Sequence, residues 1–332
     1  MRLIEVSGTF ESCGEAAGES TRDDIRAVLA ALEAEAGDRY AERHAVARRH
    51  FAAAERGCPE AAAWIRGLAR GSGLALFNAI FTAFCEEAAE TPAKGCSTLV
   101  VPSKDGTLLG HNEDYPAFNL GRMFLLRLDV PGRPRTVSLN YPGQLPGIAG
   151  SLNGHGLALT CNALPCWGDS GGVSNNVNHF KAMFAKDIGE AVRALTSGPF
   201  ALGHHYTVVP ASGAAVSIET APRRYSDSGW TVLPVGGRKP FFHTNHVLRL
   251  KLKEADAPYP DSRVRLERLK RASKKPPKDA DALMAMLSTD RTLCKTDAAA
   301  GSVTLASLVV CPAKRSFTAK GRGGAGAITR MI

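Results

Sequence analysis

The segment Lys94–Val101, KGCSTLVV, contains the cysteine of this sequence that is best placed to act as a nucleophile. A thiol attacks a carbonyl carbon efficiently once a base has removed its proton, and the sequence fixes no histidine partner for Cys96. Cutting the Gly95–Cys96 bond would supply that base, because Cys96 would gain an α-amine with a pKa of roughly 7.7–8.0. Gly95 suits the cut, since a residue without Cβ tolerates strained geometry and leaves its carbonyl open. The alternative is that Cys96 is an inert buried thiol.

The sequence GDSGG at 168–172 matches the surroundings of the nucleophile in chymotrypsin-like serine proteases. That class also needs a histidine and then an aspartate upstream, on two β-barrels. His44 and His50 are the upstream histidines at a fitting distance, and both lie in an Ala-, Arg- and Glu-rich stretch of helical character. A flexible loop of Gly, Asp and Ser is therefore the better interpretation of this motif.

The paired histidines do not form a metal-binding pattern. His204 and His205 are adjacent, so a strand would direct their side chains to opposite faces. His243 and His246 have a plausible spacing but lack the carboxylate that a zinc protease motif requires. The eight cysteines are scattered and form no Cys-x-x-Cys pair. We predict no metal, no cofactor, and reduced thiols in a cytoplasmic protein.

The character of the chain changes at Cys96, and the elements that would position it follow from that change. From 21 to 90 the apolar residues recur at helical spacing. After Cys96, short β-branched or alternating segments bounded by Gly, Pro, Asn or Asp predict strands, and helices return at 179–196, 261–273 and 279–289. Helices and strands that occur in blocks, without βαβ alternation, predict a layered α+β fold.

Composition and charge exclude several classes of protein. The 332 residues are 44% hydrophobic and 22% charged, the start is not a secretory signal, and no apolar run is long enough to span a membrane. Residues 1–95 hold 11 Lys or Arg and 15 Asp or Glu, whereas 96–332 hold 30 and 17. Much of this basic excess lies in 246–278, where charges recur at helical spacing without a nucleic-acid-binding motif. We expect a solvated helix face there, with neither a nucleic-acid nor a membrane partner.

Several segments, taken in order, carry a family resemblance: GTFESCGEAAGEST, ARGSGLALFNAIFTAFCEE, GCSTLVVPSKDGTLLGHNEDY, NGHGLALTCNAL, HTNHVL and DSRVRLERL. Together they resemble the N-terminal nucleophile (Ntn) hydrolases of the isopenicillin N acyltransferase group, distant relatives of the choloylglycine hydrolases. The resemblance implies a four-layer αββα sandwich with a helical N-terminal segment. It also implies self-cleavage into chains 1–95 and 96–332, which stay together as a heterodimer and one structural domain; homo-oligomerisation is left open.

The resemblance assigns roles around the cleaved bond. Cys96 would be the nucleophile, first in self-cleavage after Gly95 and then in acyl transfer. Thr98 would assist the self-cleavage. Asp114 would orient the new α-amine and favour its protonation balance. An aspartate that only forms a local Asx turn is the alternative for Asp114.

Further residues are assigned to the substrate side by the same resemblance. Asn162 would belong to the oxyanion hole, Asn245 would lie near the α-amine, and Arg263 would pair with the catalytic aspartate or polarise the site. His111 stands where bile salt hydrolases have arginine, which disfavours a bile-salt substrate; it and Asn112 are candidate substrate-binding residues. The alternatives are strand-end asparagines bonded to local backbone and a solvated helix arginine.

These assignments imply an amide hydrolase or N-acyltransferase. The Cys96 thiolate would attack an N-acyl amine or acyl thioester of a small molecule, and water or an amine would then accept the acyl group. The competing hypothesis is a non-catalytic scaffold that binds anions or nucleic acid through the basic 96–332 region, with Cys96 merely buried.

Overall fold

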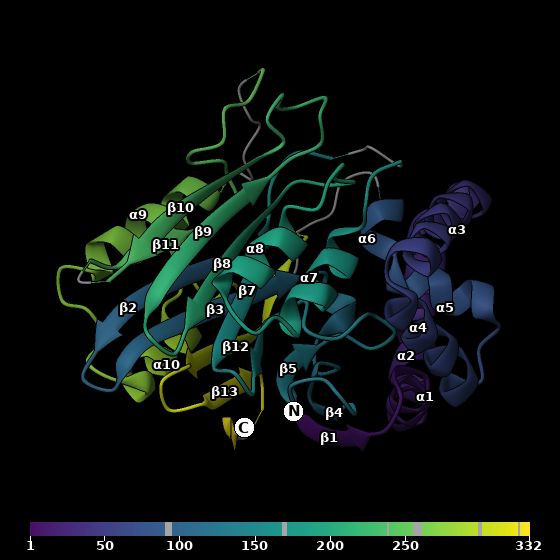
Figure 1. The fold of residues 1–332 in the computed structure, drawn as a ribbon, viewed down its shortest axis with the longest axis horizontal. Coiled ribbons are helices and arrows are strands. Elements are labelled where there is room, and N and C mark those ends of the chain that lie inside the picture. The colour runs from purple at the N-terminus through teal and green to yellow at the C-terminus, as the bar shows by residue number, and fades with distance from the viewer. Residues whose placement is uncertain (90–94, 168–170, 238, 255–260, 298–300, 325) are drawn as a thin grey trace.

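The computed structural model describes residues 1–89, 95–167, 171–237, 239–254, 261–297, 301–324 and 326–332. In this part of the chain the strands form two sheets (Figure 1). The larger sheet has the order β1 (Arg2–Ser7), β4 (Phe124–Asp129), β5 (Thr136–Asn140), β6 (Ser151–Asn153), β7 (Leu157–Ala163), β8 (His204–Pro210), β9 (Ala214–Thr220) and β10 (Trp230–Gly236). The smaller sheet has the order β11 (Phe241–His243), β2 (Ser97–Ser103), β3 (Gly106–Tyr115), β12 (Val303–Cys311), β13 (Ser316–Gly321) and β14 (Ile328–Met331).

Alternating side chains of the strands divide the core into layers. Leu126 of β4 packs in a cluster with the N-terminal helices, whereas its neighbour Leu125 packs in a second cluster with Val100 of β2. Leu99 of β2 points the other way, into a third cluster with Leu283. Because successive strand residues face opposite sides, the order is helices, larger sheet, smaller sheet, helices. The predicted four-layer αββα sandwich of α+β class is confirmed.

Two groups of helices form the outer layers (Figure 1). The larger sheet is covered by α1 (Phe10–Ser20), α2 (Arg22–Ala36), α3 (Tyr40–Gly57), α4 (Pro59–Ser72), α5 (Leu76–Ala83), α6 (Cys85–Ala88), α7 (Asn175–Met183) and α8 (Ile188–Leu195). The smaller sheet is covered by α9 (Ser262–Ala272) and α10 (Ala280–Thr289). The helix expected over 179–196 is therefore two helices, α7 and α8.

The N-terminal segment is less purely helical than the sequence suggests. Its first residues form β1, which pairs in parallel with β4, and α1 precedes the first helix that the periodicity predicts. Glycines allow α1 and α4 to approach closely, because a Cβ on Gly67 would lie 2.0 Å from the Glu11 carbonyl oxygen. The apolar stretch 74–90 breaks at Phe84 into α5 and α6. This segment thus contributes both a strand and a helical layer to the fold.

The hairpin of β2 and β3 brings the expected site residues together. The two strands are antiparallel, with Thr98 opposite His111, and β11 pairs with the other edge of β2, with His243 opposite Thr98. A bulge in β12 falls where that strand faces the end of β3, placing Thr304 opposite Asp114. Cys96 lies immediately before β2, at the end of the hairpin where these segments converge.

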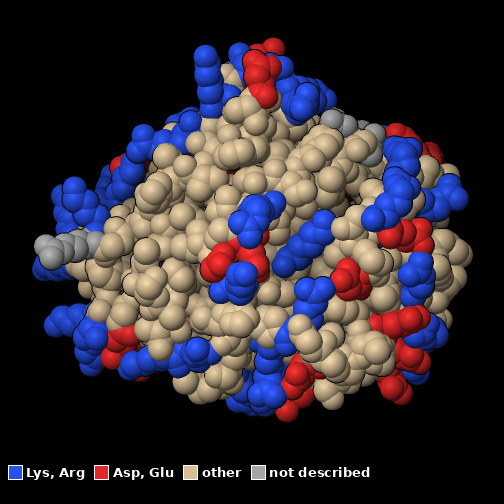
Figure 2. All heavy atoms as spheres, viewed as in Figure 1, with Lys and Arg blue, Asp and Glu red and all other residues tan. Residues whose placement is uncertain are grey.

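Lys and Arg side chains predominate along the left edge of the face in view in Figure 2, and they mix with Asp and Glu side chains on the right. The excess of positive charge expected from the sequence is thus unevenly distributed on this face.

Within the described residues, no helix has the length and apolar character needed to cross a membrane.

Candidate active site

Cys96 is enclosed in the intact chain, with 2% of its surface exposed. Its Sγ lies 3.8 Å from the main-chain oxygen of Asp114. Burial raises the pKa of the Cys96 thiol well above its usual value, and the carboxylates of Glu113 and Asp114 raise it further. A thiol in this environment stays protonated and needs a base before it can act as a nucleophile.

Asp114 lies beside the Gly95–Cys96 peptide. Its Oδ1 accepts a hydrogen bond of 2.6 Å from the Thr304 hydroxyl, and Lys295 Nζ lies 3.8 Å from Oδ2. A Cβ on Gly95 would lie 3.2 Å from Asp114 Oδ2 and only 2.1 Å from Lys295 Nζ. Burial raises the pKa of Asp114 to about 7, against the opposing effects of nearby cations. This carboxyl group is therefore poised to exchange a proton near neutral pH at the predicted cleavage point.

An arginine does reach the site, but it is Arg265 and not Arg263. Arg265 is 1% exposed and donates hydrogen bonds from Nη1 to the Cys96 carbonyl oxygen at 2.5 Å and from Nη2 to Asn245 Oδ1 at 2.8 Å. Its Nε also pairs with Asp261 at 2.9 Å. Arg263 lies on the exposed side of α9 and is not brought to Cys96. The helix rotates about 200° over two residues, so only one of these arginines can face the sheet.

Asn162 and Thr98 meet between the two sheets. The Thr98 hydroxyl donates to Asn162 Oδ1 at 2.8 Å, and His205 Nδ1 lies 3.1 Å from the same oxygen. Asn162 Nδ2 is buried and has no hydrogen-bond partner within the described residues. A buried amide N–H without a partner, on a residue bonded to Thr98 of the nucleophile strand, is the kind of donor that an oxyanion hole requires.

Asn245 and Asn112 lie in different parts of the structure. Asn245 lies in the site, where its Nδ2 donates to the Ala163 carbonyl at 2.9 Å while its Oδ1 accepts from Arg265. Asn112 donates to the carbonyl oxygens of Leu287 and Leu293 at 2.8 and 2.9 Å, on the opposite side of β3 from His111. The structure therefore does not bring Asn112 to the thiol as a substrate-binding residue. Instead, Asn112 holds the end of α10 against the sheet.

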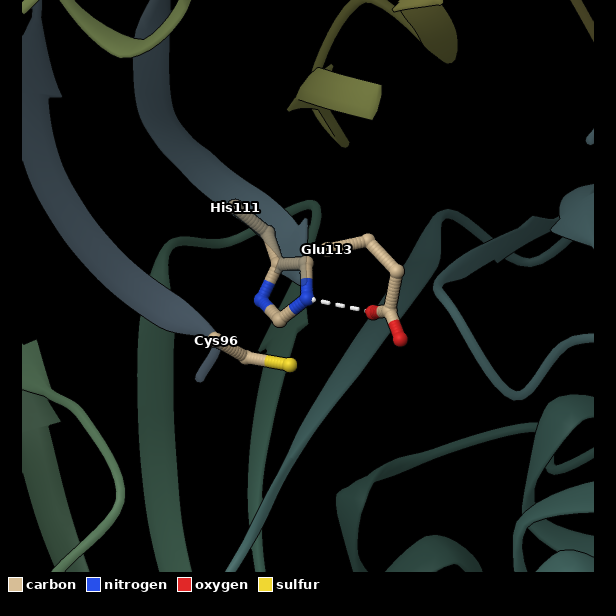
Figure 3. A group of neighbouring side chains, drawn as sticks. All are labelled: Cys96, His111 and Glu113. Atoms are coloured by element: carbon tan, nitrogen blue, oxygen red, sulfur yellow. Dashed lines mark hydrogen bonds and ion pairs between the residues drawn. The ribbon is translucent and has the colours of Figure 1, made fainter. Parts of the chain in front are cut away.

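Sequence reasoning missed Glu113, which forms a pair with His111 next to the thiol (Figure 3). His111 Nε2 lies 2.8 Å from Glu113 Oε2, and the Tyr141 hydroxyl donates to Glu113 Oε1 at 2.6 Å. Donor atoms of Cys96, His111 and Glu113 all lie within 4.8 Å of one another. Zn²⁺ accepts such a donor set, but the hydrogen bond between His111 and Glu113 accounts for the arrangement without an ion.

Four other histidines that the sequence singled out have the following places. His205 and His204 point to opposite faces of β8, toward Asn162 and Asn175 respectively, as predicted. His44 and His50 are buried in α3. Of the GDSGG motif, Gly168, Asp169 and Ser170 lie outside the described residues.

Comparison with known proteins places the chain in a family. The model of the acyl-coenzyme A:6-aminopenicillanic acid acyl-transferase family matches residues 101–320, about two thirds of the chain. The chain belongs to this family. The match confirms the resemblance to the isopenicillin N acyltransferase group, and it begins five residues after Cys96.

One curated relative adds a named activity. Beta-alanyl-dopamine/carcinine hydrolase of Drosophila melanogaster is 35% identical over 80 residues, which is 21% of each chain. The chain spans about a fifth of the length of the curated relative it matches, so that protein's activity is not transferred with the match.

Solved structures of similar shape include a Caenorhabditis elegans N-acylethanolamine-hydrolyzing acid amidase ortholog, with 15% identity and a TM-score of 0.46 over 66% of this chain and 93% of that one. A mutant conjugated bile acid hydrolase from Clostridium perfringens has 12% identity and a TM-score of 0.43 over 71% and 92%. Penicillin V acylase from Agrobacterium tumefaciens has 14% identity and a TM-score of 0.43 over 71% and 86%. At these values the similarities carry no argument about chemistry.

Proposed function

We propose that this protein is a cysteine amidohydrolase or N-acyltransferase that cleaves its own chain between Gly95 and Cys96 and then acts through an acyl-Cys96 intermediate. The observation that carries the proposal is the setting of the Gly95–Cys96 peptide. It is buried and lies against the carboxylate of Asp114, and Arg265 holds the carbonyl of the next peptide, that of Cys96. Membership of an acyl-transferase family supports the same chemistry.

Self-cleavage would begin with attack of the Cys96 sulfur on the Gly95 carbonyl carbon. The peptide nitrogen leaves with a proton as the α-amine, and a thioester links Gly95 to the sulfur. Water then hydrolyses the thioester, which releases the Gly95 carboxylate and restores the thiol. Asp114, whose pKa of about 7 lets it give or take a proton at neutral pH, contacts the Gly95 position together with Lys295 and is the group we assign to proton transfer at that nitrogen. Thr98 contributes by orienting the Asn162 amide.

Catalysis would use the new α-amine as the base for the thiol. The amine takes the thiol proton, the thiolate attacks the substrate carbonyl, and Asn162 Nδ2 donates to the resulting oxyanion. Arg265 and Asn245 keep the main chain of Cys96 in place, because both belong to one hydrogen-bonded group with the Cys96 carbonyl. No step requires a metal or an organic cofactor.

The substrates we propose are small acylated molecules. The family description names acyl transfer from a thioester, and the curated relative is named for hydrolysis of a β-alanyl amide, so an N-acyl amine or acyl thioester fits both. Whether water or an amine completes the reaction depends on access to the acyl-enzyme. The 1–95 piece would remain bound as a heterodimer, because its helices share one apolar core with β4. We also propose a cytoplasmic location, for which the scattered cysteines of the sequence are the support.

A denaturing gel with N-terminal sequencing tests self-cleavage. The 35.2 kDa chain should give pieces of about 10 and 25 kDa, in proportion to their lengths, and the larger should begin Cys-Ser-Thr-Leu. Cys96→Ala should give one intact band. Mass spectrometry with panels of N-acyl amines and acyl thioesters should then show an acyl mass gain on Cys96.

Other results would contradict the proposal. A single full-length band from the natural sequence, with no sensitivity to thiol reagents, would leave Cys96 without a catalytic role. Salt-dependent retention of that uncut protein on a polyanion column would instead favour the anion- or nucleic-acid-binding scaffold.

A further inference from the structure

The hydrogen bonds of Thr98 determine where the protons on His111 lie. Asn162 can act in an oxyanion hole only if its Nδ2 faces the substrate, which leaves Oδ1 toward Thr98, as the structure has it. The inverted amide would present an oxygen to the developing negative charge. Thr98 has one hydroxyl proton and must donate it to Asn162 Oδ1. His111 Nδ1, 2.7 Å from Thr98 Oγ1, must therefore be the donor in that contact.

The second nitrogen of His111 then shares a proton with Glu113. Nε2 and Glu113 Oε2 are 2.8 Å apart, and two bare lone pairs at that distance would repel each other. One proton must lie between them, either as imidazolium with carboxylate or as imidazole with carboxylic acid. Tyr141 cannot supply it, because its hydroxyl is already a donor to Glu113 Oε1 and burial raises its pKa well above the usual value.

Among the described residues, the proton shared by His111 and Glu113 is the one that we expect to be transferred next to the Cys96 thiol. Burial lowers the pKa of His179 to about 3 and that of His205 well below its usual value, so both rings are neutral. The Cys96 thiol lies beside the pair, since the donor atoms of Cys96, His111 and Glu113 are all within 4.8 Å of one another (Figure 3). The pair is electrically neutral as a unit, buried, and next to the reacting sulfur.

We propose that His111 and Glu113 are a general acid–base pair that protonates the departing amine nitrogen of the substrate. This inference rests on the proposed function, since it requires acyl transfer to Cys96 and an oxyanion role for Asn162. It gives the reaction two separate proton carriers. The α-amine of Cys96 carries the thiol proton, and the His111–Glu113 pair carries the proton of the leaving group.

The steps balance. In acylation the thiol proton moves to the α-amine, the carbon–sulfur bond forms, the carbon–nitrogen bond breaks, and the shared proton moves from the pair to the leaving nitrogen. In deacylation water, or an acceptor amine, loses a proton to the pair as it attacks the acyl carbon. The departing thiolate recovers its proton from the α-ammonium of Cys96. The enzyme returns to its starting protonation state.

The test separates leaving groups that need a proton from those that do not. Acetyl, hexanoyl, phenylacetyl and β-alanyl groups are each offered as the N-butyl amide and as the p-nitrophenyl ester, and acylation of Cys96 is timed by mass spectrometry. Rates are normalised to the fraction of chains that begin with Cys96. Glu113→Gln should slow acylation by the amides by about 100-fold or more, the usual contribution of a general acid. It should change acylation by the esters little, because nitrophenolate leaves without protonation.

Two further variants make the result decisive. Glu113→Asp keeps a carboxyl group and should recover part of the amide rate. Glu219→Gln removes the carboxylate of another buried pair, with His243 at 2.8 Å, and should leave the ratio of amide to ester rates unchanged. Equal slowing of amides and esters in Glu113→Gln would overturn the inference while leaving the nucleophile intact. Absence of any Cys96 adduct in the natural sequence would instead overturn the proposed function, and this inference with it.

Discussion

Replacing Arg265 by alanine should damage both the fold and self-cleavage, whereas replacing Arg263 should do neither. The two residues lie two positions apart on α9, but Arg265 is 1% exposed and Arg263 is exposed. Alanine at 265 would leave the Cys96 carbonyl and Asn245 Oδ1 without their donor. The pair with Asp261 would also be broken. The two substitutions are therefore a matched comparison of one residue type on one helix.

The expected loss of stability in Arg265→Ala follows from the contacts that the substitution removes. Breaking a buried ion pair by removing one partner costs about 3–5 kcal/mol. Asp261 is partly exposed and keeps its ion pair with Lys295 at 2.6 Å, so the lower end of that range, about 3 kcal/mol, is expected, chiefly from the two buried oxygens that lose their donor. An exposed substitution such as Arg263→Ala stays within about 0.5 kcal/mol. Urea unfolding in the uncut Cys96→Ala background measures both without interference from cleavage.

Cleavage kinetics provide the second readout. With Cys96 present, Arg265→Ala should slow formation of the two chains, because the main chain of the nucleophile is no longer held. Arg265→Lys keeps the charge but cannot bind the same acceptors in a fork, so its cleavage rate should lie between those of the natural sequence and Arg265→Ala. The reasoning is refuted if Arg263→Ala costs as much as Arg265→Ala, or if Arg265→Ala leaves stability and cleavage unchanged.

Three further predictions concern neighbouring groups. Because burial raises the folded-state pKa of Asp114 to about 7, from 3.8 in the unfolded chain, the folded state binds the extra proton between these values. The stability of uncut Cys96→Ala protein should therefore fall by up to ~4 kcal/mol as the pH rises from about 4 to 7, and Asp114→Asn should remove this slope in urea titrations. Gly95→Ala should slow cleavage on a timed gel, because its Cβ would displace the ammonium of Lys295, and adding Lys295→Ala should restore part of the rate; no rescue would contradict the steric explanation. Asn112→Ala should lower the free energy of unfolding by about 1–3 kcal/mol, because two buried carbonyls lose the Asn112 donor. KM should not change; a raised KM would show that Asn112 binds substrate after all.

The sequence predicted the layers better than it predicted the first twenty residues. Helical and alternating periods are local signals, so the change at Cys96 and a layered α+β fold could be anticipated from them, whereas the four-layer arrangement was implied by the family resemblance. Strand β1 has only one fully buried residue, Ile4, and exists because it pairs with β4 more than 110 positions later. Helix α1 packs against α4 through small residues at helical spacing, but its buried glycines Gly14 and Gly18 weaken the local helical signal. The strand depends on a tertiary pairing that no local pattern records, and the helix on a close approach to α4.

Arg265 could have been predicted as the site arginine from helix geometry. The buried face of α9 consists of Ser262, then Arg265 and Leu266 three and four residues later, and then Leu269. Arg263 falls between them. Applying the helical period to this segment would have selected the arginine that packs with the leucines, since a charged residue on an apolar face needs a partner inside the protein.

The same period explains why the strand His111-Asn112-Glu113-Asp114 contains two different groups of functional residues. Successive side chains of β3 face opposite sides. His111 and Glu113 face the other sheet; His111 meets Thr98 of the neighbouring strand β2, and Glu113 meets Tyr141. Asn112 and Asp114 face the helical side, where Asp114 meets Thr304 and Lys295. Alternation could have predicted this division, but which face held the thiol depended on where the chain before β2 enters the site. With the thiol on the His111 side and the Gly95 peptide on the Asp114 side, one strand can serve substrate proton transfer on one face and chain cleavage on the other.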